Sequence, residues 1–234
     1  MGKTVLVGGC LNSKAPITTD PVFANNTWEQ IIKACQSNSV PDTWVVGDQK
    51  AMTINGINYA IDIIGKNHDT YTAGGTAPLT FQMHKCYGTQ YYNMNSSETN
   101  SGGWRDTVMR NTHLPAILKL MPSEVQAGIK EVNKLTSAGS NSSTINTSAD
   151  KLFLLSEVEV FGTNGGSKAG EGTQYEYYKA GNSTVKAFNT NDADDWWLRS
   201  PYNSSTYFCY VDWDGNRFST DADSVLGVAF AFCF

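Results

Sequence analysis

Apolar residues along this chain fall mostly into short runs that are separated by polar turns, a pattern typical of β-strands. Two of these runs, residues 51–54 and 59–64, flank Asn55-Gly56, which is a strong signal for a two-residue hairpin turn. Further strands are predicted at residues 44–48, 79–83, 152–155 and 158–161, and short strands and loops from residue 196 onward. The pattern favours an antiparallel sheet.

Helical spacing occurs once early in the chain and again in its middle. Apolar residues at helical spacing begin at Trp28, directly after Thr27, which is a residue type that caps helices well. Three further helices are predicted, at residues 104–110, 114–121 and 124–131. Strands and helices do not alternate, so a doubly wound parallel sheet is not expected.

The predicted class is therefore α+β, with short antiparallel strands, a few helices and long structured loops. Residues 137–148 and the glycine-rich residues 162–172 are predicted to be such loops. Residues 1–25, with a short strand at 4–7 and then two prolines, are interpreted as an N-terminal arm or attachment segment. Residues 26–234 are interpreted as a single domain.

Composition narrows the function classes. Hydrophobic residues make up 40% of the 234 residues, which is enough for a sizeable core, while charged residues make up only 17%. The net charge is -5 and no basic patch is visible, so a nucleic-acid surface is not expected. The apolar runs are too short to span a bilayer, so no membrane insertion is expected.

No catalytic residue, metal site or cofactor is predicted. The five cysteines contain no C-x-x-C pair and are interpreted as reduced, buried thiols, although a Cys209–Cys233 bridge stays open. His68 and Asp69 are adjacent, but no nucleophile motif accompanies them, so a structural histidine is favoured over a general base. Gly165-Gly166 lacks the residue order of a phosphate-binding loop.

Residues 207–218 are predicted to form a β-hairpin with Asp214-Gly215 at its turn. If Cys209 and Val211 face the core, then Phe208, Tyr210 and Asp212 point the other way.

Asp212, Asp214 and Asn216 also have the spacing of the first three ligands in a calcium loop. Arg217 stands where such a loop requires glycine, so the hairpin turn explains the same residues more simply.

The hairpin lies within residues 202–224, a segment of small polar and aromatic residues between two apolar blocks. Tyrosine supplies contact area at low entropic cost, and Asn or Ser supplies adaptable hydrogen bonds, so this segment is the candidate binding face. A structural hairpin with packed aromatic residues is the alternative. The candidate ligand-binding residues are Tyr202, Asn203, Ser205, Thr206, Phe208, Tyr210, Asp212, Trp213, Asp214, Asn216, Phe218, Thr220, Asp221 and Asp223.

Several blocks in the chain resemble a bacterial and phage family of unknown function that is known by its Trp-Trp-Leu-Arg-Ser-Pro motif. The motif stands at residues 196–201, and Gly227-Val228 matches the start of the family's C-terminal motif, although the Arg-Pro of that motif is missing. Other matching blocks occur in family order, including residues 46–48, 64–69, 92–95, 102–104, 114–115, 150–159 and 174–175. The resemblance covers about residues 28–234.

The resemblance implies a C-type-lectin-like fold whose ligand-facing surface lies between these two motifs. It also implies a virion protein, on the capsid or tail surface of a bacteriophage, or alternatively a protein of the bacterial cell surface. Some phage proteins with this fold have that segment diversified by a retroelement that mutates adenines. Residues 202–226 are rich in Asn, Ser, Thr, Tyr, Asp, Phe and Cys, which adenine changes can produce from Asn codons, whereas Trp213 is not easily produced in this way, so diversification is a minor hypothesis.

Three functions are therefore weighed. The first is a non-enzymatic virion structural protein that binds a host-surface glycan or protein receptor through residues 202–224 and other virion proteins through residues 1–25. The second is a purely structural capsid decoration or tail component without a ligand of its own. The third, a remote one, is an enzyme of the formylglycine-generating type. No heptad pattern points to a homo-oligomer, and the oligomeric state stays open.

Overall fold

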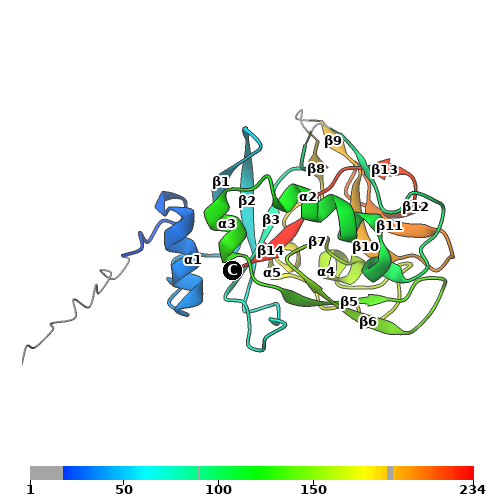
Figure 1. Ribbon diagram of the computed structural model, residues 1–234, viewed down its shortest axis with the longest axis horizontal. Coiled ribbons are helices and arrows are strands. Elements are labelled where there is room, and N and C mark those ends of the chain that lie inside the picture. The colour runs from blue at the N-terminus through cyan, green and yellow to red at the C-terminus, as the bar shows by residue number, and fades with distance from the viewer. Residues whose placement is uncertain (1–17, 89, 189–191) are drawn as a thin grey trace, which may run out of the picture.

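The computed structural model describes residues 18–88, 90–188 and 192–234. The largest sheet has five antiparallel strands in the order β1-β2-β3-β14-β7 (Figure 1). These strands are β1 (Gln49–Ile54), β2 (Ile57–Lys66), β3 (Leu79–Met83), β14 (Ala231–Cys233) and β7 (Leu152–Phe153). The C-terminal strand therefore lies inside the sheet and ties the end of the chain to its middle.

A second, three-stranded antiparallel sheet has the order β10-β11-β12. Its strands are β10 (Trp196–Pro201), β11 (Tyr207–Val211) and β12 (Arg217–Asp221). Three strand pairs accompany the two sheets: β4 (Tyr92–Asn93) with β13 (Val225–Leu226), β5 (Val132–Ser137) with β6 (Ile145–Asp150), and β8 (Lys186–Ala187) with β9 (Ala193–Asp194). Figure 1 places β11 and β12 at one end of the molecule's long axis and α1 (Trp28–Gln36) at the other.

The helices are short. In the described ranges they are α1, α2 (Leu114–Leu118), α3 (Ser123–Gly128), α4 (Glu157–Phe161) and α5 (Glu176–Lys179), with 3-10 turns η1 (Phe23–Asn25) and η2 (Gly103–Asp106) and a π-helical turn η3 (Met109–His113). The predicted start of α1 is confirmed. Thr27 Oγ1 accepts a hydrogen bond from the Gln30 N–H at 3.2 Å, and the Gln30 side chain accepts one from the Thr27 N–H at 2.7 Å.

An aromatic cluster centred on Phe81 of β3 forms part of the core. Its ring stacks on Phe232 at 5.3 Å and on Phe23 at 6.1 Å, and the Trp28 ring meets it edge-on at 5.9 Å. Because Phe23 is buried, the packed domain includes residues before 26. The strand expected at residues 4–7, and the arm as far as residue 17, lie outside the described residues.

Several predicted elements are confirmed and others need correction. The hairpin turn at Asn55-Gly56 is confirmed, and both residues have the positive φ angles that such a turn requires. Residues 44–48 form a turn rather than a strand, because the Asp48 carboxylate accepts a hydrogen bond from the Val45 N–H at 2.9 Å.

The middle of the chain differs more from the prediction. The predicted strand at 158–161 belongs to helix α4, whose start is fixed by hydrogen bonds between Ser156 and Glu159 in both directions. The predicted loop at 137–148 is only the turn of a hairpin and the first part of β6. The helix predicted at 104–110 is split into η2 and η3, and α2 and α3 end earlier than predicted.

The architecture is mixed, with mostly antiparallel sheets and few helices, so the predicted α+β class is confirmed. In the part of the chain that the structure describes, every helix is too short or too polar to cross a bilayer.

Candidate functional site

The β11–β12 hairpin has a tightly bonded turn. The Asp212 N–H donates to the Asn216 carbonyl at 2.9 Å, and the Asp212 carboxylate accepts from the N–H groups of Asp214 at 3.1 Å and Asn216 at 2.6 Å. Gly215 has the positive φ angle of 84° that the turn needs. The carboxylate that fitted a calcium loop is thus used to hold the turn. Within the described ranges, no group of three or more His, Cys, Asp or Glu residues is placed to hold a metal ion.

The two most exposed aromatic side chains of this hairpin project into solvent. Trp213, in the turn, is 63% exposed, and Phe218 on β12 is 55% exposed. Tyr210 lies opposite Phe218 on β11, with ring centroids 6.1 Å apart, and its other neighbour is Trp197 at 6.3 Å. Large exposed apolar side chains on a rigid, hydrogen-bonded turn are typical of recognition surfaces.

The candidate residues of segment 202–224 lie almost entirely at the surface. The exposed ones are Asn203, Ser205, Trp213, Asp214, Asn216, Phe218 and Asp223; the partly buried ones are Tyr202, Thr206, Tyr210, Asp212, Thr220 and Asp221; and Phe208 is buried. Two segments therefore make the face: the 202–206 loop and the hairpin with its following turn.

The predicted outward orientation of Phe208 is wrong, because its side chain is 0% exposed. Phe208 lies on the central strand of the sheet, between Pro201 of β10 and Thr220 of β12. Its neighbour Cys209 points to the opposite face and is also buried, so both faces of the sheet are covered at this end. Strand alternation alone does not reveal such two-sided burial.

The glycine-rich loop supports this face from behind. A Cβ atom on Gly166 would lie 1.8 Å from Cε2 of Tyr202, and one on Gly165 would lie 2.4 Å from Cδ of Arg217. The Gly166 carbonyl also accepts a hydrogen bond from the Asn203 N–H at 2.9 Å. These glycines let the loop approach Tyr202 and Arg217 closely, where a larger residue would clash.

Asn100 fixes the shape of the 202–206 loop, and the sequence gave no sign of this role. Its fully buried side-chain amide donates hydrogen bonds to the carbonyls of Tyr202 at 3.4 Å, Ser204 at 3.1 Å and Tyr207 at 2.8 Å. Its side-chain oxygen accepts from the Ser140 N–H at 2.7 Å. One side chain therefore connects the loop to the β5–β6 hairpin.

The two tryptophans of β10 are scaffold. Both are 0% exposed, and each indole N–H donates to a distant backbone carbonyl, Trp196 to Thr184 at 3.0 Å and Trp197 to Tyr92 at 2.7 Å. These bonds anchor the elements that precede the candidate face.

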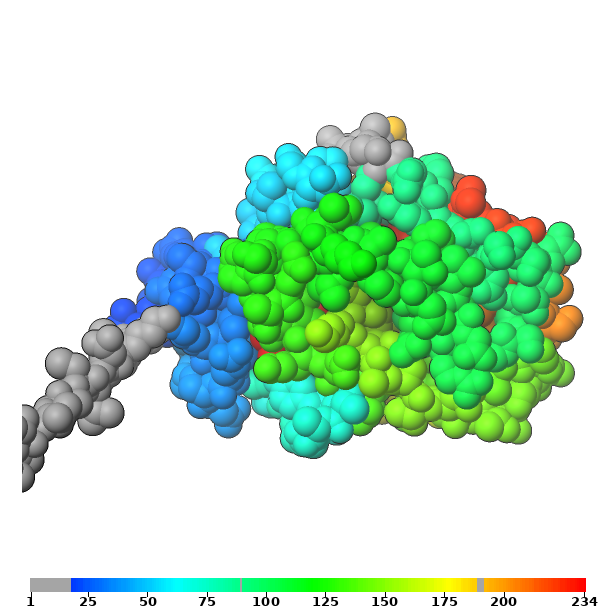
Figure 2. All heavy atoms as spheres, viewed as in Figure 1, coloured from blue at the N-terminus to red at the C-terminus, as the bar shows by residue number. Residues whose placement is uncertain are grey.

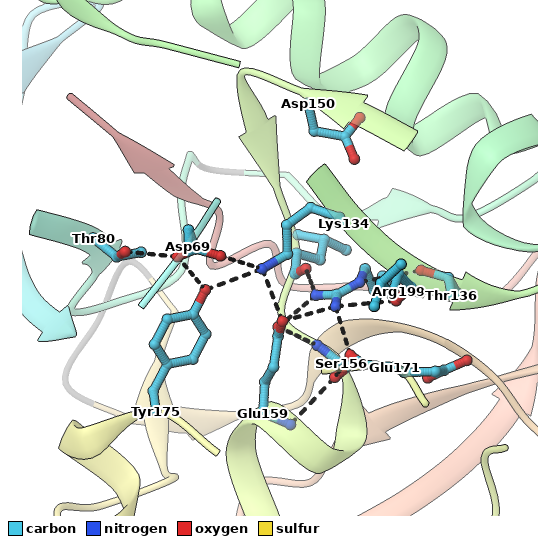
Figure 3. Close-up of polar contacts among 12 residues, drawn as sticks. Asp69, Thr80, Lys134, Thr136, Asp150, Ser156, Glu159, Glu171, Tyr175 and Arg199 are labelled. Carbon is cyan, nitrogen blue, oxygen red and sulfur yellow. Dashed lines mark hydrogen bonds and ion pairs between the residues drawn. The ribbon is translucent and has the colours of Figure 1, made fainter. Parts of the chain in front are cut away.

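Arg199, also on β10, lies in a buried network of charges (Figure 3). Its guanidinium binds the Glu159 carboxylate with two bonds of 2.5 and 2.8 Å, and Glu159 also contacts Lys134 Nζ at 2.8 Å. Lys134 in turn binds the Asp69 carboxylate at 2.7 Å. Two cations and two carboxylates thus balance inside the protein, which is how buried charges are tolerated.

The predicted preference for a structural His68 fits this arrangement. The His68 ring stacks on Tyr175 at 4.0 Å, while the Asp69 carboxylate binds Lys134, Thr80 and Tyr175.

Glu171 lies beside this network under β10. Its carboxylate accepts hydrogen bonds from the Ser137 N–H at 2.8 Å and from the Ser200 hydroxyl. Burial raises the pKa of Glu171 to about 7, against the opposing effect of these two hydrogen bonds. The folded protein therefore holds a proton on Glu171 at a pH where an exposed glutamate has lost it.

Replacing Glu171 with glutamine should change how stability depends on pH. The folded-state pKa of Glu171 lies above the ordinary value of 4.5. The protonated carboxyl therefore makes its full contribution to the free energy of unfolding below pH 4.5, and this contribution is lost as the pH rises through about 7. The free energy of unfolding of the wild type, relative to Glu171→Gln, should fall by roughly 3 kcal/mol across that window. Urea unfolding at several pH values measures this, and parallel curves for the two proteins would refute it.

An open groove of about 1050 Å³ lies elsewhere, between the end of α1, the 67–78 loop and residues 127–131. These three segments meet on the face that Figure 2 shows. The lining of the groove includes Lys130, Lys151 and Glu131. It also includes Cys35, and burial raises the pKa of the Cys35 thiol to about 12. That thiol is protonated at neutral pH and is therefore a poor nucleophile.

The other described cysteines are also buried and have thiols with raised pKa values. Cys86, Cys209 and Cys233 are buried and free, so the Cys209–Cys233 bridge that the sequence left open is not formed. Burial raises the pKa of all three thiols, that of Cys86 to about 12. Cys10 lies outside the described residues.

Comparison with models of known protein families assigns most of the chain to one family. A domain of unknown function, DUF6273, matches residues 74–234, which is more than half of the chain. The matched range includes β10, the candidate face and the network residues Lys134, Glu159 and Arg199, while Asp69 lies just before it. The chain belongs to this family. Searches of curated proteins and of solved structures found no match.

Proposed function

We propose that this chain is a non-enzymatic recognition protein whose binding face comprises the β11–β12 hairpin and the 202–206 loop. The observation that carries this proposal is the pair of exposed aromatic side chains, Trp213 and Phe218, on a rigid hairpin at one end of the molecule. Exposed aromatic residues of this size, held on a fixed scaffold, are typical of binding hot spots.

The chemistry of the face suits a carbohydrate or a polar protein surface. Aromatic rings provide apolar area for the hydrophobic face of a sugar, and the neighbouring Asp214 and Asn216 provide acceptors and donors for hydroxyl groups. The face is also preorganised, because Asp212 holds the turn and Asn100 holds the loop. Preorganisation lowers the entropic cost of binding.

We further propose that the fold is C-type-lectin-like and that the protein is displayed on a phage virion, on the capsid or tail. The resemblance at residues 196–201 and 227–228 supports this reading. The arrangement in Figure 1 also supports it, because α1, which follows the N-terminal segment, lies at the opposite end from the candidate face. Residues 1–25 would then contact other virion proteins while the hairpin faces a glycan or protein on the host.

A purely structural role is the second candidate, with the same hairpin packed against a neighbouring subunit. Val225, which is 55% exposed and close to the hairpin in sequence, would suit such an apolar contact. A virion structure with segment 202–224 buried against another subunit would favour this reading. The formylglycine-generating alternative is less well supported, because the described thiols are buried and have raised pKa values.

The proposal is tested by adsorption of the purified protein to a panel of bacterial cells. The double variant Trp213→Ala/Phe218→Ala should bind about thirty-fold more weakly than the wild type, which corresponds to about 2 kcal/mol. Leu120→Ala is the matched control, since Leu120 is 44% exposed but lies after α2, away from the hairpin. It should bind as the wild type does. Equal adsorption of all three proteins would overturn the site assignment.

A further inference from the structure

Lys134 has an environment that an ordinary buried salt bridge does not need. Its Nζ atom lies 2.7 Å from Asp69 Oδ1, 2.8 Å from Glu159 Oε1 and 3.1 Å from the Tyr175 hydroxyl (Figure 3). The same nitrogen lies 4.3 Å above the centre of the Phe153 ring. The Lys134 side chain and both carboxylates are at most 3% exposed, so water is excluded from the contact.

We propose that Lys134 and Asp69 form an intramolecular isopeptide bond, with Glu159 as the proton carrier. The three requirements of such a bond are present: an amine and a carboxyl group in contact, a second carboxylate on the same amine, and a dry apolar surrounding. The site is a modification site and is independent of the proposed recognition function.

The atoms of the reaction balance without a further reactant. The Lys134 ammonium first gives one proton to Asp69 Oδ1, and the free amine then attacks Cγ of Asp69. Electrons of the Cγ–Oδ2 double bond move onto Oδ2. Glu159 takes a second proton from the nitrogen and delivers it to the Oδ1 hydroxyl. The Cγ–Oδ1 bond breaks, water leaves, the carbonyl re-forms at Oδ2, and the amide nitrogen keeps one hydrogen.

The groups around Asp69 suit this path. The hydroxyls of Thr80 and Tyr175 both donate to Oδ2, at 2.6 and 2.8 Å. They therefore hold the oxygen on which negative charge develops, as oxyanion-stabilising donors do. Oδ1 faces Lys134 and is the oxygen that departs. Cys233 Sγ, at 3.7 Å from Oδ2, completes the described contacts of this carboxylate.

The charges of the network balance both before and after the reaction. Before it, Asp69 and Glu159 oppose Lys134 and Arg199. The bond removes one charge of each sign, and the bidentate pair of Glu159 with Arg199 is left. An uncompensated buried charge, which is costly, never arises.

The starting state is an ion pair, so we expect the bond to form slowly in the folded protein. Burial favours the neutral acid, but the Lys134 charge and the hydrogen bonds from Lys134 and Thr80 outweigh it and bring the pKa of Asp69 to about 2. Proton transfer from nitrogen to oxygen must therefore precede attack. The completed bond would join the segment after β2 to β5, 65 residues further along the chain.

Intact mass spectrometry of the denatured full chain tests the proposal. After incubation of the folded protein, the wild type should become lighter than its sequence mass by one water molecule, and fragmentation should give a branched peptide that joins Lys134 to Asp69. Glu159→Gln should slow the water loss, and Lys134→Met should abolish it. Lys186→Met is the matched control, because Lys186 is also buried but donates to the backbone carbonyls of Met83 and His84. The Lys186→Met variant should still lose one water molecule.

Two results would overturn the proposal. One is a wild type that keeps its full sequence mass after prolonged incubation. The other is a water loss that persists in Lys134→Met, since Asp214-Gly215 can also lose water by forming a succinimide. Both results are masses of whole chains. The first is measured on the wild type itself, so it can be interpreted even if a variant folds poorly.

Discussion

Arg199→Met is expected to lower the free energy of unfolding by about 3–5 kcal/mol. Methionine fills much of the arginine's volume but removes the two bonds to Glu159. It also removes the bonds to the Leu154 carbonyl at 2.8 Å and the Glu171 carbonyl at 2.9 Å. The larger loss is electrostatic, because Glu159 and Asp69 then share Lys134 alone and one buried negative charge is uncompensated.

The double variant Arg199→Met/Glu159→Gln separates charge from packing. It leaves Lys134 and Asp69 as a balanced pair, so we expect it to recover part of the stability that Arg199→Met loses. Recovery should be incomplete, since the carbonyls of Leu154 and Glu171 remain without the arginine. Urea unfolding of the four proteins of the cycle measures this, and a double variant less stable than Arg199→Met would refute the charge argument.

Asn100→Asp is expected to lower the free energy of unfolding by about 3 kcal/mol and to loosen the candidate face. The substitution keeps the size of the side chain but replaces its donating amide by a carboxylate. Three backbone carbonyls, those of Tyr202, Ser204 and Tyr207, would then face a negative oxygen in place of a hydrogen-bond donor. Like partial charges in a buried site repel strongly.

The control for this change is Asn25→Asp, at an exposed position in η1. This turn directly precedes α1, which lies at the opposite end of the molecule from the hairpin (Figure 1). Asn25→Asp makes the same chemical change in water and should alter stability by less than about 0.5 kcal/mol. Hydrogen exchange should also show faster opening of residues 202–207 in Asn100→Asp. Unchanged exchange in that loop would contradict the role assigned to Asn100.

The elements that were predictable from sequence are those fixed by neighbouring residues. Asn55-Gly56 and Asp214-Gly215 determine their turns locally, and Thr27 with Gln30 determines the start of α1. Helix α4 was missed because Val158 and Val160 alternate with polar residues, as in a strand. The Ser156–Glu159 capping box was nevertheless a readable signal for a helix.

The surface position of most candidate residues was predictable from sequence, but the contacts that hold them in place were not. Thirteen of the fourteen proposed residues reach the surface, whereas Phe208 does not, because β11 is covered on both faces at that end. The Asp69–Lys134 contact joins residues 65 positions apart, and the Asn100–Tyr207 contact joins residues 107 positions apart. Spacing in one sequence carries no information on such distant pairs.

Fluorescence quenching of Trp213 tests the central claim most directly. All six tryptophans lie in described residues, and the other five (Trp28, Trp44, Trp104, Trp196 and Trp197) are buried, so acrylamide should quench mainly Trp213. Quenching is measured with and without surface polysaccharide extracted from bacterial cells to which the wild type adsorbs in the binding test. If segment 202–224 is the binding face, the polysaccharide should reduce quenching to the level seen in Trp213→Phe. Binding that leaves quenching unchanged would contradict the account.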